Sequence, residues 1–362
     1  MSQAEAAGDY GPGAYRSDAI PPLPEPPRKR DRFGEDLLPF GDHAHIDPHQ
    51  RVVEDAELVQ HEDRQDPEFY QSDDWWWDHQ RISFLKSQLG LSVVLMGFPV
   101  FYFLFLNAFP FWLSGAIEDY IRSEFGNLAY AALGGFILMA GLLVAMVLTV
   151  YTTQPVFNSL IRFVAFLLKP FHSFLAARGR RYLENRRSEF NRRTGMVRFA
   201  RGRWKPPLEA PFVEFDAYLE RVVQRGGIFY RLMFVHRYSG EQFSHTSLSG
   251  VVAHHHEVRA LWDMLQRYMD VTQPLPDVPR LEPFRHQDPV TADHDRNTGR
   301  DPRYWRDLDL EAWKAGEGAE RHTSQANYPW RQLRCRLTPQ LGRIDMDSYR
   351  ARQARLQPDV AA

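Results

Sequence analysis

Two long hydrophobic stretches, separated by a short charged turn, dominate the sequence between residues 87 and 151. Neither residues 87–117 nor residues 128–151 contain Asp, Glu, Lys, Arg or His. A helix needs about 20 apolar residues to cross a bilayer, because its backbone polar groups must be satisfied internally there. Each Leu, Ile, Phe or Val also favours insertion by a few tenths of a kcal/mol. The sequence therefore predicts a transmembrane hairpin formed by helices at 87–117 and 128–151.

The residues flanking the hairpin predict its orientation. The turn at residues 118–127 carries one arginine and three acids, whereas Arg81 and Lys86 precede the first stretch. Several basic residues follow the second stretch: Arg162, Lys169, Arg178, Arg180, Arg181, Arg186 and Arg187. Lys and Arg near the ends of spans mark the cytoplasmic side. Both termini are therefore expected in the cytoplasm. Two helices cannot enclose a pore, so a channel would require an oligomer, which the sequence leaves open.

The region before the hairpin divides into two parts. Residues 1–70 contain a proline-rich run at 20–27 and scattered charges, and are expected to form a disordered tail, because such a segment buries little apolar surface. Residues 71–86 form a tryptophan-rich segment, expected at the membrane interface. Indole rings favour the headgroup region, so we expect Trp75, Trp76 and Trp77 to act as interface anchors.

Residues 155–187 are expected to form a basic amphipathic helix on the membrane surface. Apolar residues recur there at helical spacing, and Arg162 and Lys169 interrupt them. The arginines are expected to bind anionic lipids, at about 1 kcal/mol per residue near the surface. These candidate lipid-binding residues are Arg178, Arg180, Arg181, Arg186 and Arg187. Nucleic acid is the competing partner, but the position beside a span favours lipid, and no nucleic-acid binding is expected.

From residue 188 the pattern changes from helical to strand-like. The sequence predicts hairpins with turns at Thr194–Gly195 and Ser239–Gly240, a half-buried strand at 212–219 and a central strand at 229–235. An amphipathic helix follows, carrying Val258, Leu261, Trp262, Leu265 and Met269 on one face. Residues 188–272 are thus expected to be a cytosolic β-sheet domain capped by a helix, of the pleckstrin-homology-like type. The expected fold class is an α+β membrane protein.

Residues 273–362 are expected to form an extended C-terminal arm and a mobile tail. They are rich in Pro, Asp, Arg and His at first and then alternate basic and acidic residues. A short helix is expected at 304–313, with Trp305 and Trp313 packing back onto the domain. Cys335 is the only cysteine, so an internal disulfide is excluded.

Two clusters suggest metal chemistry, and neither has the required spacing. His254, His255, His256 and Glu257 are consecutive, so their side chains point about 100° apart on a helix, and a His-Glu-x-x-His pattern is absent. Residues 293–299 approximate a calcium loop, but the glycine comes one place late, and Tyr304 occupies the position of the bidentate glutamate. The sequence also contains no phosphate-binding loop or nucleophile elbow. We therefore expect no catalytic residues, no metal and no cofactor.

The tryptophans before the hairpin, the motif at 190–197, the motif at 236–242 and the Trp-bearing helix together resemble an uncharacterised bacterial family. Its members are two-span inner-membrane proteins with a cytosolic domain of unknown function, often encoded near type VI secretion genes. The resemblance covers roughly residues 70 to 320. It implies the bacterial inner membrane and a non-enzymatic interaction or accessory protein with an unknown protein partner, in type VI secretion. The alternative is an immunity protein against a cognate secreted toxin; a membrane-bound hydrolase or nuclease using His254–Glu257 comes third.

Overall fold

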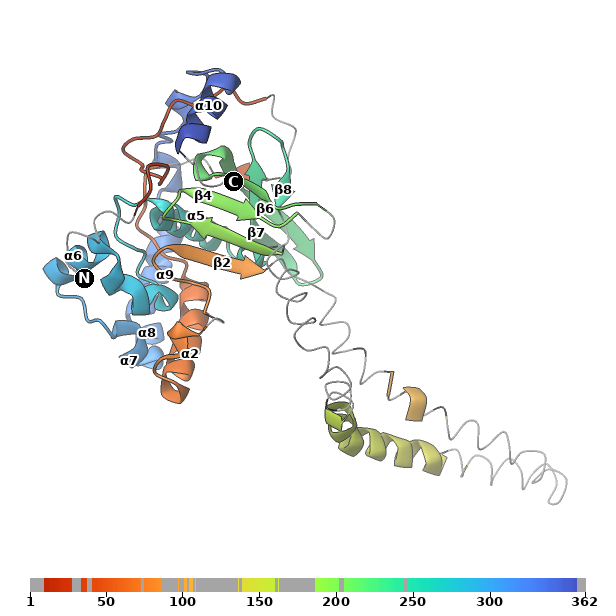
Figure 1. Cartoon of the computed structure of the whole chain (residues 1–362). Helices are drawn as coiled ribbons and strands as arrows, with labels where there is room; N and C mark the ends of the chain where they lie inside the picture. Colours follow the sequence, from red (N-terminus) through yellow and green to blue (C-terminus); the bar gives the residue numbers. More distant parts are fainter. Residues whose placement is uncertain are drawn as a thin grey trace. The chain divides into compact units, whose positions relative to one another are not determined.

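The structure is a computed structural model in which the chain forms two compact units (Figure 1). It describes residues 10–27, 34–37, 41–72, 75–85, 97, 101–102, 104–106, 108, 136, 139–159, 162, 186–201, 205–243 and 246–356. Unit 1 comprises Met1–Lys86 and Leu183–Ala362, and unit 2 comprises Ser87–Tyr182. Unit 1 is a mixed α+β fold with two antiparallel sheets.

Unit 2 is inserted into the sequence of unit 1 between two strands of the first sheet. The four strands of this sheet run in sequence order: β2 (Arg81–Leu85), β3 (Arg187–Asn191), β4 (Met196–Phe199) and β5 (Leu208–Pro211). Leu85 at the end of β2 pairs with Arg187 at the start of β3. Unit 2 is therefore inserted between two neighbouring strands. The segment 71–86, expected at the membrane interface, instead begins at the last residue of η1 (Phe69–Gln71) and ends with β2. Ile82 and Phe84, which lie on the same face of β2, are buried in the core.

The second sheet has the order β1-β6-β7-β8. Its strands are β1 (Glu35–Asp36), β6 (Phe215–Gln224), β7 (Gly227–His236) and β8 (Gln242–Phe243), with η3 (Phe212–Glu214) before β6 and η4 (Ser247–Ser249) after β8. Both predicted hairpins are present, with Gly195 (φ 72°) and Gly240 (φ 70°) at their turns. Positive φ is accessible to glycine without a Cβ clash, which is why the sequence indicates these turns.

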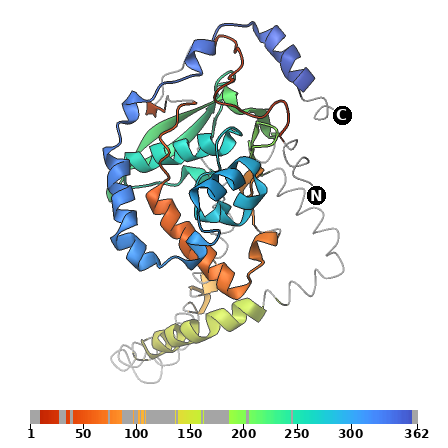
Figure 2. The ribbon, with the colours of Figure 1, turned by 90° about the vertical axis from the view of Figure 1, so that its left-hand side faces the viewer.

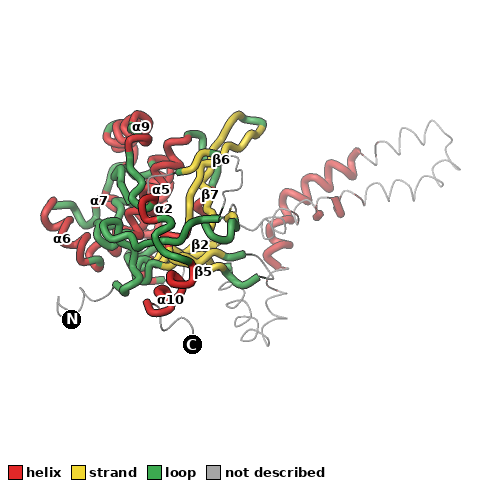
Figure 3. Tube along the Cα trace, turned by 90° about the horizontal axis from the view of Figure 1, so that it is seen from above, coloured by secondary structure: helices red, strands yellow, loops and turns green. Residues whose placement is uncertain are grey.

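The predicted amphipathic helix is α5 (His255–Met269), which packs against β6 and β7 (Figure 3). Phenylalanine rings from both sheets form the core beneath it. Phe199 is fully buried and stacks on Phe243 at 4.4 Å between ring centroids. Trp262 of α5 contacts Phe212 and Phe234 at 5.8 and 6.2 Å. One continuous aromatic core thus joins the two sheets and the helix.

The N-terminal region is ordered where a disordered tail was expected. Helix α2 (His49–Gln65) packs against the C-terminal helices (Figure 2), and buries Val52, Ala56 and Val59. Leu23 is fully buried and forms a β-bridge with Leu341. Residues 1–70 contain too few apolar residues for a core of their own, but the described part of this segment adds its apolar residues to the core of the domain.

The C-terminal region also departs from the expected arm and mobile tail. It contains η5 (Pro279–Gln287), α6 (Pro289–Thr298), α7 (Tyr304–Asp307), α8 (Leu310–Ala315), α9 (Glu317–Asn327), η6 (Trp330–Gln332), η7 (Thr338–Gln340) and α10 (Met346–Leu356). The predicted helix at 304–313 is split into α7 and α8, but Trp305 and Trp313 are buried as predicted. In α10, the Tyr349 hydroxyl is buried and donates to Glu214 Oε1 at 3.0 Å, which holds α10 against the sheet domain.

Within unit 2, residues Met139–Ser159 form one helix that is long and apolar enough to cross a membrane. It passes the predicted end of the span at residue 151 and continues through Pro155, which membrane helices tolerate. The helix is thus continuous across the expected division between the span and the interfacial segment, and the place where it leaves the membrane stays a prediction. Apolar side chains on it are exposed, including Leu143 (62%) and Val150 (73%). Most of the first stretch, the turn at 118–127 and residues 163–185 lie outside the described residues.

Candidate functional site

A groove of about 820 Å³ on unit 1 is a candidate binding surface formed by described residues. It is formed by the start of α5, the edge formed by β1 and β6, one residue of β7 and the segment 326–332. We call it the α5 groove. The side chains that give it its character are Arg221, Tyr230, Arg259, Tyr328, Trp330 and Arg331.

The floor of the α5 groove is held by aromatic packing and one ion pair. Trp330 is 9% exposed and its Nε1 donates to the Gln325 carbonyl at 3.2 Å. The Tyr328 ring lies 4.9 Å from the Trp330 ring. Arg259 Nη2 lies 2.7 Å from Glu35 Oε2, an ion pair that connects α5 to β1. These contacts present a preformed surface, which lowers the ordering cost of binding.

The α5 groove carries excess positive charge. Three arginines line it, and Glu35 is the only acidic residue among its lining residues. Arg221 and Arg331 are exposed and can meet a ligand, whereas Arg259 is already paired with Glu35. Burial and then the neighbouring Arg259 lower the pKa of His255, so this imidazole is neutral near pH 7. A groove with two exposed arginines and an aromatic floor suits an acidic, partly apolar ligand.

The predicted lipid-binding arginines are only partly described. Arg178, Arg180 and Arg181 lie outside the described residues. Arg187 is the first residue of β3, and its Nη2 donates to Ser83 Oγ at 2.7 Å while its guanidinium lies 6.0 Å from the centre of the Trp76 ring. Burial lowers the pKa of Arg187. Arg187 thus connects β2 and β3, and its side chain is 30% exposed, so its contact with lipid headgroups stays a prediction. Arg186 precedes it in a turn and is partly exposed.

The tryptophans predicted as interface anchors pack within unit 1. Trp77 is 4% exposed and belongs to the core, and Trp76 packs against that core. The Trp75 ring lies 4.9 Å from the Phe69 ring. The anchor prediction is therefore wrong for Trp77. A tryptophan run beside a hydrophobic stretch suits both a headgroup layer and a protein core, and composition does not separate them.

A Glu–His–Ser arrangement in the second sheet resembles a catalytic triad by distance alone. His236 Nε2 lies 2.9 Å from Glu214 Oε2, and His236 Nδ1 lies 2.8 Å from Ser239 Oγ. The Ser239 backbone N–H also donates to Nδ1 at 3.1 Å, so the lone pair that would act as base is already engaged. Tyr349 donates to the second oxygen of Glu214. The arrangement stabilises the β7–β8 turn and its contact with α10.

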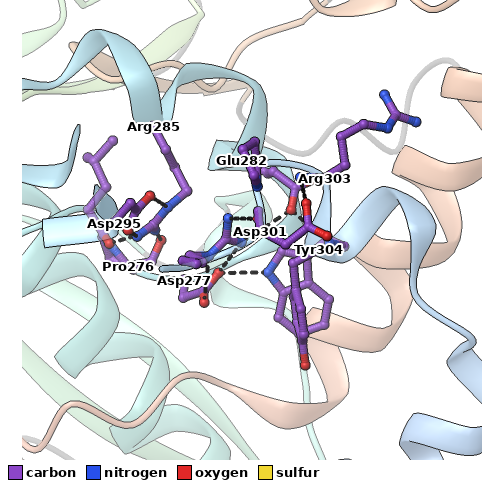
Figure 4. A network of polar contacts seen from close by, with 12 residues as sticks. Pro276, Asp277, Glu282, Arg285, Asp295, Asp301, Arg303 and Tyr304 are labelled. Atoms are coloured by element: carbon purple, nitrogen blue, oxygen red, sulfur yellow. Dashed lines mark hydrogen bonds and ion pairs between the residues drawn. The ribbon is translucent and has the colours of Figure 1, made fainter. Parts of the chain in front are cut away.

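The second polar cluster is a network of carboxylates and arginines around η5 and α7 (Figure 4). Asp277 Oδ1 accepts hydrogen bonds from Arg300 Nη2 at 2.7 Å and from Trp305 Nε1 at 2.8 Å. Glu282 accepts the Trp305 backbone N–H at 2.7 Å. Burial opposes ionisation of Asp277, but the hydrogen bond and charge of Arg300 lower its pKa. The carboxylates are satisfied by fixed donors, so the network holds the C-terminal region in place.

The histidines at the start of α5 meet a partner that the sequence did not suggest. His322 of α9 approaches them, and its Nε2 lies 3.4 Å from His256 Nε2. His256, Glu257 and His322 each place a potential ligand atom within 4.8 Å of the other two. Burial is the main factor that lowers the pKa of His256 to about 4, so its ring is neutral near pH 7. The spacing of consecutive residues on a helix excludes that three of them bind one metal ion, but it does not predict a ligand from another helix.

No protein-family model, curated protein or solved structure matched the chain. Function is therefore inferred from the geometry of the two units and from the sequence resemblance.

Proposed function

We propose that the chain is a non-enzymatic interaction protein anchored in the bacterial inner membrane by unit 2, with unit 1 and both termini in the cytoplasm. The observation that carries this proposal is the insertion of unit 2 between β2 and β3, two paired neighbours of one sheet. Both ends of the hydrophobic segment thus enter the same folded domain. A segment that leaves and re-enters a domain at adjacent strands crosses a membrane an even number of times.

The hairpin itself is supported by contacts within unit 2. Residues of the first hydrophobic stretch, including Tyr102, are helical, and the helix Met139–Ser159 begins within the second stretch and extends beyond its end. The Tyr102 hydroxyl and Thr152 Oγ1 lie 2.8 Å apart, so the two stretches are in contact. Interhelical hydrogen bonds of this kind contribute about 1 kcal/mol in a membrane. We infer two antiparallel spans joined by the turn at 118–127.

We further propose that the sheet domain is of the pleckstrin-homology-like type. Four sequential antiparallel strands are followed by three more in a second sheet, and α5 then packs on the core. In this proposal, unit 2 occupies the loop between the first two strands, and β1 is an additional edge strand. The assignment concerns the fold only, since one fold supports many functions.

The proposed partner is a protein that presents an acidic segment to the α5 groove. Within the part of the chain that the structure describes, Arg221 and Arg331 form no ion pair with an acidic residue, and Trp330 provides an apolar floor. The type VI secretion context comes from the family resemblance, and in that context the partner is a cytoplasmic part of the secretion machinery. Anionic lipids remain the proposed contact of Arg178, Arg180 and Arg181.

The topology is tested by reporter fusions to the full chain at Gly126 and Ala362. A periplasmic signal at Gly126 and a cytoplasmic signal at Ala362 are expected; a periplasmic signal at Ala362 would contradict the proposal.

The groove is tested by a photo-crosslinking residue at Tyr328 in living cells. Reversing two charges, Arg221→Glu with Arg331→Glu, should abolish the crosslinked product. Arg296→Glu is the matched control, because Arg296 is an exposed arginine on α6. Crosslinks that survive the charge reversal would contradict groove binding. Rescue of cells poisoned by a neighbouring toxin gene would favour the immunity alternative.

A further inference from the structure

We propose that His256, Glu257 and His322 form a binding site for a divalent transition-metal ion of the Zn²⁺ type, which fastens α9 to the start of α5. The proposal does not depend on the function of the α5 groove. Imidazole nitrogens with one carboxylate oxygen are a common ligand set for Zn²⁺.

The spacing of the two imidazoles fits a shared ion. Zn–N bonds are about 2.0–2.1 Å long, so two nitrogen ligands of a tetrahedral Zn²⁺ lie about 3.4 Å apart. The two Nε2 atoms of His256 and His322 are separated by 3.4 Å. A direct hydrogen bond between neutral imidazoles is the alternative, but this separation exceeds the usual range of about 2.7–3.2 Å for an N–H donor.

The environment of Glu257 is the second, independent observation. Glu257 is 4% exposed, and the Gln50 backbone N–H donates to both of its carboxylate oxygens at 3.3 and 3.4 Å. Among the described residues, no Lys or Arg forms an ion pair with Glu257. Burying a carboxylate is costly without a compensating positive charge. A divalent ion between Glu257 and the two histidines would supply that charge.

A further imidazole and a cavity lie beside the site, although the imidazole is outside the group of three ligands. The His49 ring lies 5.1 Å from the His322 ring, and its Nδ1 is buried without a hydrogen-bond partner in the described structure. His49 begins α2, so this imidazole comes from a third helix. Glu257 also lines a cavity of about 190 Å³ with Gln50 and Arg51, through which a hydrated ion could reach the carboxylate.

Fully buried Gln325 supports the proposed ligands from α9, one turn after His322. Its Nε2 donates to the His256 carbonyl at 3.5 Å. Such outer contacts orient metal ligands, and their loss commonly lowers affinity about 10- to 100-fold. Gln325 would therefore act as a positioning residue and not as a ligand.

The test uses the untagged full chain, purified in detergent and stripped of metal with a chelator. Titration with Co²⁺ should give one equivalent of tightly bound ion with the visible absorption of a four-coordinate site, and Zn²⁺ should displace it. His322→Gln and Glu257→Gln should each lower the affinity by at least about 100-fold, beyond the loss typical of an outer contact. His61→Gln, at an exposed histidine of α2, is the control and should bind like the wild type.

Thermal unfolding of the same variants separates loss of a ligand from loss of the fold. Saturating Zn²⁺ should raise the Tm of the wild type and of His61→Gln, but not that of His322→Gln or Glu257→Gln. If the wild type binds no Co²⁺ at micromolar concentration, or if both site variants bind as tightly as the wild type, the proposal is wrong.

Discussion

Unit 2 should be removable without loss of the sheet domain, because β2 and β3 are already paired neighbours. The change replaces residues 87–185 with Asn-Gly, leaving Lys86 and Arg186 on either side. The Leu85–Arg187 pair then continues into a two-residue turn, for which Asn-Gly is the favoured sequence. The product should be a water-soluble, folded domain, since the exposed apolar helix Met139–Ser159 is deleted with unit 2.

A second deletion variant allows the stability gained from the short turn to be calculated. It joins Lys86 to Arg186 through a flexible Gly/Ser linker, so that the connection between the paired residues is about eight times longer. Loop-closure entropy grows as about (3/2)RT ln n, so the linker variant should be less stable by about 2 kcal/mol. This difference arises in the unfolded ensemble and leaves the contacts of the folded domain unchanged.

Both deletion variants are compared by urea unfolding, followed by tryptophan fluorescence and near-ultraviolet circular dichroism. We expect one cooperative transition in each, equal m-values and a higher midpoint for the Asn-Gly variant. If only the linker variant folds, or if the Asn-Gly variant is the less stable one, β2 and β3 are not adjacent in the folded domain. The inserted hairpin would then be refuted together with the topology built on it.

Two further predictions concern buried groups of unit 1. Arg192 is fully buried and donates to the carbonyls of Arg267, Tyr268 and Gln273. Arg192→Ala should therefore lower the free energy of unfolding by about 3–5 kcal/mol in the same urea assay. Arg193 is its exposed neighbour, and the control Arg193→Ala should change the free energy of unfolding by less than about 0.5 kcal/mol. Burial alone would raise the pKa of Asp270, but hydrogen bonds from neighbours such as His43 lower it to about 2. The folded protein thus favours the ionised carboxylate of Asp270. This preference contributes about 2 kcal/mol to the free energy of unfolding above pH 4, and the contribution is lost as the pH falls through 2. The stability difference between wild type and Asp270→Asn should follow this curve, and a pH-independent difference would contradict it.

Local signals are sufficient for the parts of the fold that depend on neighbouring residues. The turns at Gly195 and Gly240 require positive φ, and the glycine at each is visible in the sequence. The apolar stripe of α5 recurs at helical spacing, and it packs on the sheets as expected. Each of these features is determined within about ten residues of sequence.

The errors concern segments whose order depends on distant parts of the chain. Leu23 stands in a proline-rich run and Tyr349 in polar surroundings in the sequence, and each contacts a residue more than a hundred positions away. The hydrophobic stretch that follows Trp77 favours the membrane interface for this residue, yet it packs in the core. The hydrophobic periodicity of the sequence does not indicate contacts between such distant residues. The sequence does not reveal the role of His322 for the same reason, since it is separated from His256 by four elements of structure.

The first turn of α5 connects the two candidate sites of unit 1. His255 lines the α5 groove, and the next residues, His256 and Glu257, belong to the proposed metal site. On the other side, α9 carries His322 and leads within six residues to Tyr328 of the groove. An ion that fastens α9 to α5 would therefore also fix the segment that forms the groove floor. Consecutive side chains of a helix point in different directions, so one short segment can face a metal ion on one side and a partner protein on the other.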